Sequence, residues 1–188
     1  DHFMHTTHVT RGEEWLPSLP IHLELFDTMG WERPKYAHLP VIMKVENGNR
    51  RKLSKRKDKE AAVSYYHEQG IPVEAVKLYL MTIGNSNFEE WLNQNPDASI
   101  NDFKFNFKKM SASGSLFDLE KLINISRNYI SRLKAFEVYE RALKHSLEFD
   151  KEFNELLVKY KDYCINMFNI EREQKKPRKD YAMFSEIK

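Results

Sequence analysis

The sequence is organised around one basic stretch, Asn47-Gly48-Asn49-Arg50-Arg51-Lys52-Leu53-Ser54-Lys55-Arg56-Lys57-Asp58-Lys59. From Lys44 to Lys59 there are eight Lys or Arg residues against Glu46 and Asp58, a net charge of +6, whereas the whole chain of 188 residues carries +2. Most charge runs are solvated surface loops, and charge alone leaves that alternative open. The sharper hypothesis is a loop that binds phosphate groups.

The segments before this stretch predict a strand, a helix and a second strand, in that order. Residues 3–9 are rich in β-forming side chains and predict a short strand. Residues 18–29 predict a helix, and residues 36–43 a second strand, which a turn at Asn47-Gly48 follows. The order is βαβ-like, so we expect the basic stretch to leave a strand and enter a helix at residues 59–69.

That position favours phosphate binding over a bland surface loop. The first N–H groups of a helix have no partners within the helix, and the helix dipole is positive at this end. Anions therefore bind readily at a helix N-terminus. Lysines in a neighbouring loop add point charges that suit a polyphosphate.

Beyond Gly70-Ile71-Pro72 the sequence predicts helices separated by loops. We expect helices at 73–83, 88–92, from 117, at 134–147 and at 150–168, and loops at 95–99 and 111–115. In the last two helices, the apolar residues expected to pack are Phe136, Tyr139, Leu143, Leu147, Phe153, Leu156, Leu157, Tyr160, Cys164 and Met167. Residues 103–109 alternate Phe with Lys, which fits an edge strand or an RNA-facing strip; core Phe residues with solvated lysines are favoured.

The composition limits the classes of protein. Hydrophobic residues at 41% and aromatic residues at 13% indicate a folded chain. No apolar run approaches the roughly 20 residues that span a membrane, and we find no signal-peptide pattern. Cys164 lies among apolar residues and is expected to be a small buried hydrophobe in a reducing cytosol. His2, His5 and His8 lack a supporting Cys or carboxylate cluster, so no metal site is predicted.

Five motifs, in this order, resemble bacterial glutamyl-tRNA synthetases of class I. They are Thr7-His-Val-Thr-Arg-Gly-Glu-Glu-Trp15, Pro20-Ile-His22, Gly30-Trp31, Ala37-His-Leu-Pro40 and Lys52-Leu-Ser-Lys-Arg56. The last resembles the second signature of class I aminoacyl-tRNA synthetases. Two later segments, Gly114-Ser-Leu-Phe-Asp-Leu-Glu-Lys-Leu122 and Asn128-Tyr-Ile130, resemble the family's region that contacts the tRNA stem.

The resemblance implies a mainly α fold with a small α/β part. Residues 1–70 would be the C-terminal part of a Rossmann-like catalytic domain, residues 71–132 a helical stem-contact region, and residues 133–188 a helical pair leading towards an anticodon-binding region. The family's first signature, a His-x-Gly-His-type motif, is absent from these 188 residues. We therefore expect a fragment that is inactive alone.

For the basic stretch, the resemblance implies a role in glutamate activation by ATP. The glutamate carboxylate attacks the α-phosphorus in line, so charge builds on phosphate oxygens, and cations aimed at that charge assist. Lys52 and Lys55 match the family's signature lysines and are the predicted catalytic residues. Lys55 would be the main contact to the ATP phosphates, with Ser54 and Arg56 shaping the loop.

The other predicted site residues lie before the basic stretch. Arg11 matches the family's arginine that binds a substrate carboxylate, where a planar fork suits two oxygens. Glu14 and Trp15 match residues that hold the adenosine, with the carboxylate accepting from ribose hydroxyls. Ile42 would line the adenine pocket. No protein-bound metal is predicted.

The implied reactants and partners are ATP with Mg²⁺, glutamate and tRNA(Glu), acting in the cytoplasm, with a monomeric protein and no membrane. Two alternatives are a non-catalytic helical RNA-binding module and a glutaminyl-type relative. A tRNA-modifying paralogue is disfavoured, because such paralogues lack the helical region of residues 71–188. The Arg11-Gly-Glu-Glu-Trp15 and Lys52–Arg56 motifs favour the glutamyl branch over the glutaminyl one.

Overall fold

The computed structural model of the chain describes residues 1–96, 98–110 and 113–188. The chain forms two compact units. The N-terminal unit consists of Asp1–Leu53 and Asn106–Phe117, and the helical unit consists of Ser54–Phe105 and Asp118–Lys188. The predicted loops at 95–99 and 111–115 include residues 97, 111 and 112, which lie outside the described part.

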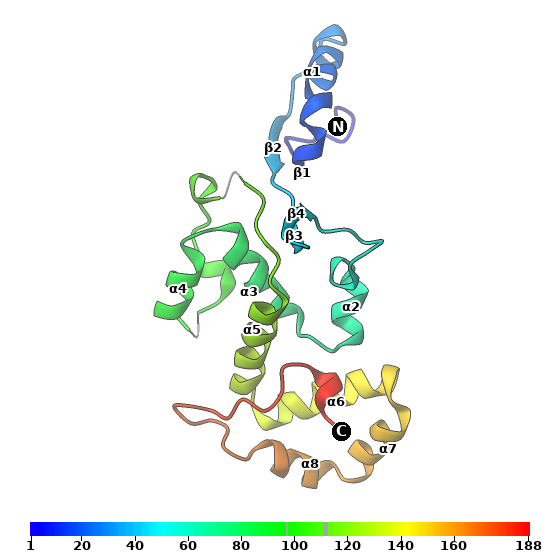
Figure 1. Ribbon diagram of the computed structural model, residues 1–188, viewed down its shortest axis with the longest axis vertical. Helices are drawn as coiled ribbons and strands as arrows, with labels where there is room; N and C mark the ends of the chain where they lie inside the picture. The colour runs from blue at the N-terminus through cyan, green and yellow to red at the C-terminus, as the bar shows by residue number, and fades with distance from the viewer. Residues whose placement is uncertain (97, 111–112) are drawn as a thin grey trace. The chain divides into compact units, whose positions relative to one another are not determined.

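Helices outnumber strands, as Figure 1 shows. The elements are β1 (His8–Gly12), α1 (Leu19–Thr28), β2 (Lys35–Leu39), β3 (Met43–Glu46), β4 (Asn49–Lys52), α2 (Val63–Glu68), α3 (Val73–Gly84), α4 (Phe88–Gln94), α5 (Leu119–Arg132), α6 (Ala135–Phe149), α7 (Lys151–Lys159) and α8 (Lys161–Phe168). Short 3-10 helices lie at Glu13–Ser18, Lys59–Ala61, Ile100–Asp102, Phe107–Lys109 and Phe184–Glu186. The predicted fold class, mainly α with a small α/β part, is confirmed.

The N-terminal unit begins with a βαβ arrangement, as the sequence predicts. Strands β1 and β2 run parallel, with Arg11 opposite His38, and α1 connects them. The predicted strand at 3–9 is wrong in its bounds, because the chain turns at its start. The His5 amide donates to the His2 carbonyl, and His5 has a φ of 52°, so pairing begins only at His8.

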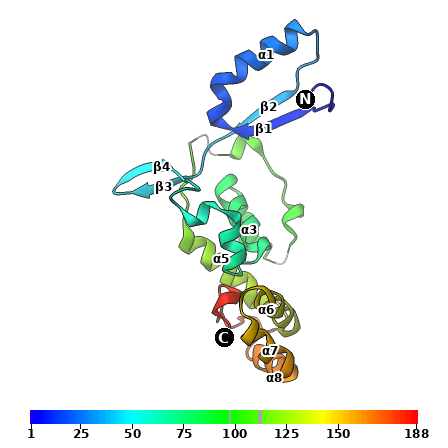
Figure 2. The same cartoon turned by 90° about the vertical axis from the view of Figure 1, so that its right-hand side faces the viewer.

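An antiparallel hairpin of β3 and β4 follows, and it is seen clearly in Figure 2. Asn47 and Gly48 have φ values of 52° and 78°, which a two-residue hairpin turn with positive φ at both positions requires. The predicted turn is therefore confirmed. The expectation of a loop directly after it is wrong, because the turn folds Asn49–Lys52 back onto β3 as a strand.

The segment Asn106–Phe117 returns to the N-terminal unit and pairs with β3. The Met43 amide donates to the Ser115 carbonyl at 2.8 Å, and the Phe117 amide donates to the Met43 carbonyl at 2.7 Å. A Cβ at Gly114 would collide with the Val41 carbonyl oxygen, so only glycine permits this close approach.

The helical unit has its main core around α6. Buried side chains from the end of α5, from α6, α7 and α8 and from the C-terminal segment pack together: Ile130, Leu133, Ala135, Val138, Tyr139, Ala142, Leu157, Cys164, Phe168, Phe184 and Ile187. The predicted packing of Tyr139, Leu157 and Cys164 is confirmed. The expected burial of Phe136 and Leu147 is wrong, because α6 turns its smaller residues Ala135 and Ala142 inwards instead.

Two further expectations for helices need correction. The predicted helix at 150–168 is divided at Tyr160, whose backbone (φ −114°, ψ 36°) leaves the helical region between α7 and α8. The predicted helix at 59–69 is a 3-10 helix followed by the short α2. In the region of α7 and α8, the residues Leu156, Tyr160 and Met167 are exposed, so their expected packing in the core is wrong.

The Phe and Lys alternation at 103–109 forms no strand, so the edge-strand alternative is wrong. Phe103 packs edge-on against Phe88 and Trp91, with ring centroids 5.0 Å and 5.3 Å apart. This contact agrees with the favoured interpretation, a core aromatic, for Phe103, whereas Phe105 and Phe107 are exposed, so that interpretation is wrong for them. In the described part of the chain, no helix is long and apolar enough to cross a membrane.

Candidate functional site

Arg11 lies near the end of β1, where charged side chains of parallel strands commonly meet ligands. Its Nε donates to Nε2 of His38 on β2 at 3.0 Å. Its guanidinium lies over the rings of Tyr36 and Trp15, at 5.2 Å and 5.7 Å from their centroids. The guanidinium is therefore held in one orientation by two strands and the 3-10 helix after β1.

One end of this guanidinium has no partner in the described part of the chain. The Nη2 atom of Arg11 is buried and makes no hydrogen bond there, and the same holds for the hydroxyl of Tyr36. A buried donor without an acceptor is costly, so such groups need an explanation. A carboxylate oxygen is the acceptor that a guanidinium fork binds best.

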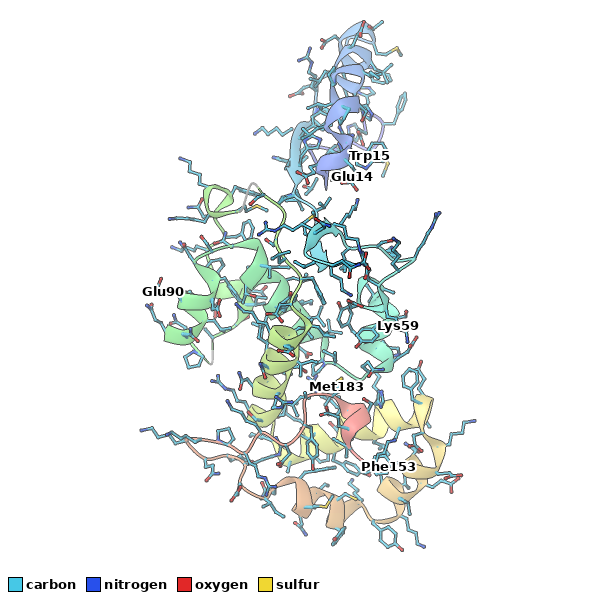
Figure 3. All side chains as sticks on the ribbon, in the orientation of Figure 1. Glu14, Trp15, Lys59, Glu90, Phe153 and Met183 are labelled. Atoms are coloured by element: carbon cyan, nitrogen blue, oxygen red, sulfur yellow. The ribbon has the colours of Figure 1, made fainter. Side chains whose placement is uncertain are left out.

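Glu14 and Trp15 follow β1 on the 3-10 helix Glu13–Ser18, next to one another in Figure 3. The Oε1 atom of Glu14 accepts from Nζ of Lys52 at 2.7 Å, and both side chains are exposed. The hydrogen bond from Lys52 lowers the pKa of Glu14 below its usual value. Because the pair is exposed to water, its attraction is weak and easily exchanged for another partner.

Lys52 ends β4, and Ile42 precedes β3, so the hairpin places their backbones close together. The Leu53 amide donates to the Ile42 carbonyl at 2.8 Å, which continues the hairpin by one bond. The Ile42 side chain is half-buried. Within the N-terminal unit, the Arg11 guanidinium thus lies over the Trp15 ring, and Glu14 forms an ion pair with Lys52.

The second part of the basic stretch lies in the helical unit and forms a tight turn. The Lys57 and Asp58 amides donate to the Ser54 carbonyl at 3.0 Å and 2.8 Å. The Ser54 amide donates in return to Oδ2 of Asp58 at 2.9 Å. Lys55, Arg56 and Lys57 are exposed on this turn, whereas Asp58 is buried.

Three residues of this region were not singled out from the sequence as site candidates. His38 and Tyr36 orient Arg11. The sequence feature that could have revealed them is the spacing of two residues between Tyr36 and His38, which places both side chains on one face of β2. Asp58 was counted only as a negative charge within a basic run. The residue type could have indicated the role of Asp58, because an Asp side chain readily accepts hydrogen bonds from backbone amides within a few residues.

Cys164 contributes to the core rather than to this region. It is buried, and burial raises the pKa of its thiol. A raised pKa disfavours the thiolate, which is the nucleophilic form. The predicted role as a small buried hydrophobe is in keeping with these surroundings.

Comparison with known proteins identifies the family. Residues 1–124 match the family of class I tRNA synthetases (E and Q), catalytic domain. The chain is 52% identical over 187 residues to a glutamate–tRNA ligase of Acetivibrio thermocellus, and 50% identical over 188 residues to one of Clostridium perfringens. Each match covers all of this chain and 34% of the relative, so the chain spans about a third of the length of these proteins.

Solved structures share the fold of this chain. The glutamate–tRNA synthetase of Elizabethkingia anophelis matches the whole chain and 38% of its own length, with a TM-score of 0.69 and 24% identity, a likeness of fold. A glutamate–tRNA ligase of Elizabethkingia meningosepticum, solved with its amino acid, matches 90% of the chain and 38% of its own length, with a TM-score of 0.62 and 25% identity. The chain therefore belongs to the class I tRNA synthetases of the glutamate and glutamine type.

Proposed function

We propose that this chain is part of a glutamate–tRNA ligase, which activates glutamate with ATP and transfers it to the 3′ end of tRNA(Glu). The observation that carries the proposal is the 52% identity to such a ligase along the whole chain. A free-standing RNA-binding module would have no need of a buried, oriented guanidinium such as that of Arg11, whose Nη2 has no hydrogen-bond partner among the described residues.

Arg11 is the proposed contact to a carboxylate of the substrate glutamate. His38 and the rings of Tyr36 and Trp15 fix the fork before substrate arrives, so little conformational entropy is lost on binding. The buried Nη2 supports this role, because a carboxylate oxygen would satisfy it.

The ATP contacts are proposed residue by residue. Glu14 would accept from the ribose hydroxyls, Trp15 would hold the adenosine, and Ile42 would line the adenine pocket. Lys52 and Lys55 would contact the phosphates. The exposed pair of Glu14 with Lys52 supports an exchange of partners, because a phosphate and a ribose hydroxyl can each replace one half of a weak ion pair.

Ser54 and Arg56 are the proposed supports of the phosphate-binding turn. We expect Mg²⁺ to arrive on the phosphates of ATP, since Mg²⁺ is usually held through few carboxylates plus substrate phosphates. We further propose that the protein acts in the cytoplasm as a monomer. The division into residues 1–70, 71–132 and 133–188 stays a prediction about functional regions.

The test replaces the matching segment of the Acetivibrio thermocellus ligase with residues 1–188 of this chain. With glutamate, tRNA(Glu) and ATP, this chimera is expected to exchange pyrophosphate into ATP within about tenfold of the parent rate, a difference of about 1.4 kcal/mol in the barrier. The matched control is the same chimera with Arg11→Met, which keeps an apolar stem but removes the fork. We expect its KM for glutamate to rise.

Two results would contradict the proposal. The first is a chimera that unfolds cooperatively at the parent's temperature but shows no exchange. The second is a chimera that binds tRNA(Glu) with the parent's salt dependence and still shows no exchange, which would favour the RNA-binding alternative.

A further inference from the structure

Asp58 is a buried acidic residue at the end of the most basic part of the sequence. It is 3% exposed, whereas Lys55, Arg56 and Lys57 before it are exposed. The proposed function gives it no role. A buried carboxylate needs hydrogen bonds to offset its lost hydration, so its contacts indicate what it does.

The contacts of Asp58 close a turn around the exposed cations. Its Oδ2 accepts from the Ser54 amide at 2.9 Å, and its own amide donates to the Ser54 carbonyl at 2.8 Å. Both backbone polar groups of Ser54 are thus bonded to one residue. The three intervening residues carry three positive charges, which repel one another and favour an open loop when nothing closes it.

The closed turn is also fixed on its far side. The Asp58 carbonyl accepts from the Ala61 amide at 3.1 Å, which joins it to the 3-10 helix Lys59–Ala61. The hydroxyl of Tyr66 on α2 donates to the Glu60 carbonyl at 2.5 Å. Asp58 therefore connects the cationic turn to a supported helix.

We propose that Asp58 is a positioning residue for Ser54, Lys55 and Arg56, and this inference rests on the proposed function. In this proposal, Asp58 acts through these residues rather than on the substrate. By holding the turn closed before ATP binds, it presents Lys55 at a fixed place. Charge that develops in the transition state is stabilised best by groups that need no reorganisation. Loss of Asp58 is therefore expected to lower kcat more than it raises KM.

A matched control exists in the same unit. The Ser99 amide donates to Oδ2 of Asp102 at 3.0 Å, the same type of bond closing a different turn. Asp102→Ala removes one such bond far along the sequence from the basic stretch. Asp58→Asn keeps an oxygen that can accept from Ser54, whereas Asp58→Ala keeps none.

The first measurement is amide hydrogen exchange in the 188-residue chain. The Ser54 amide is expected to be protected in the unmodified chain, in Asp58→Asn and in Asp102→Ala, and to exchange at least about tenfold faster in Asp58→Ala. Equal protection of Ser54 in Asp58→Ala and in the unmodified chain would overturn the inference.

The second measurement is pyrophosphate exchange by the chimera described above. Asp58→Ala is expected to lower kcat about 30-fold and to leave the KM for glutamate within about twofold, with Asp58→Asn and Asp102→Ala near the unmodified rate. An unchanged kcat in Asp58→Ala, or an equal loss in Asp58→Asn, would contradict a positioning role.

Two controls keep the outcomes distinct. If Asp58→Ala does not fold, Asp58→Leu keeps the bulk without an acceptor; failure of both to fold would overturn the inference, because Asp58 would then maintain the fold. If the unmodified chimera shows no exchange, the proposed function fails, while protection of Ser54 still decides whether Asp58 closes the turn.

Discussion

At the scale of residues, Arg172 shows how a buried charge can hold helix ends together. Its Nε donates to the Phe168 carbonyl at 2.5 Å, and its Nη1 donates to the carbonyls of Ile130 and Leu133 at 2.8 Å and 3.2 Å. These carbonyls lie at the C-terminal ends of α8 and α5, where helix partial charges are negative. Burial lowers the pKa of Arg172, but the fork remains a donor.

Arg172→Met is expected to lower the free energy of unfolding by about 3 kcal/mol, because the carbonyls of Phe168, Ile130 and Leu133 each lose a hydrogen bond from a charged donor. Urea unfolding of the 188-residue chain measures the loss. Arg178→Met is the matched control: Arg178 is exposed and pairs with Asp180, so its loss is expected to stay below about 1 kcal/mol. Equal losses would contradict the role given to Arg172.

A second prediction at this scale concerns the effect of Lys55→Ala on the rate of glutamate activation. In the chimera this substitution is expected to slow glutamate activation by about a hundredfold, since a cation aimed at phosphate charge is lost from the transition state. The Kd for tRNA(Glu) should change by less than about threefold. Pyrophosphate exchange and filter binding measure the two quantities, and similar effects on both would refute the role of Lys55.

At the scale of elements, Tyr66 fixes the 3-10 helix Lys59–Ala61 to α2. Its hydroxyl donates to the Glu60 carbonyl, and burial, with smaller effects of Tyr79, Glu60 and Tyr65, raises its pKa to about 12. The ordinary value is 10.0. The neutral hydroxyl is thus favoured in the folded protein relative to the unfolded chain.

This shift predicts an alkaline dependence of stability. The contribution of Tyr66 is fully present below pH 10 and is lost as pH rises from 10 through about 12, because only the unfolded chain ionises readily in that window. Tyr66→Phe should lower the free energy of unfolding by about 1 kcal/mol at neutral pH. Between pH 10 and 12, the free energy of unfolding of this variant should fall less than that of the unmodified chain. Urea unfolding across that range measures both.

Tyr163→Phe is the control for this comparison, because Tyr163 is exposed. It should match the unmodified chain at neutral pH and show the full alkaline loss. If the free energy of unfolding of Tyr66→Phe fell as much between pH 10 and 12 as that of the unmodified chain, the assignment of the alkaline dependence to Tyr66 would be contradicted.

Elements with local signals could be predicted from the sequence. The Asn47-Gly48 turn and the strand, helix, strand order have their causes within a few residues. Asn49–Lys52 was missed because charged side chains carry little β propensity, and the strand forms through its pairing with β3. The break at Tyr160 was missed because apolar spacing continues across it.

The same distinction between local signals and long-range contacts applies to the candidate site. The motifs predict Arg11, Glu14 and the signature lysines as site residues, because those residue types recur at fixed spacing in the family, and this assignment stays a prediction. The pairing of Glu14 with Lys52 and of Arg11 with His38 joins residues 38 and 27 positions apart. Such contacts depend on how β1, β2 and the hairpin meet in space, and one sequence holds no local signal for that.

At the scale of the whole molecule, the chain carries about a third of the length of its relatives. The 188-residue chain by itself is expected to show no pyrophosphate exchange with glutamate, ATP and tRNA(Glu), because the family's first signature is not among its residues. Exchange above a blank without enzyme would contradict this expectation, and the intact chimera is the positive control.

The proposed function is tested most sharply by the charging of tRNA(Glu) by the chimera, with labelled glutamate compared with labelled glutamine. Glutamate charging is expected to fall with Arg11→Met and with Lys55→Ala, and no charging with glutamine is expected. A folded chimera that charges glutamine, or one that charges glutamate equally well after both substitutions, would contradict the proposed function as part of a glutamate–tRNA ligase.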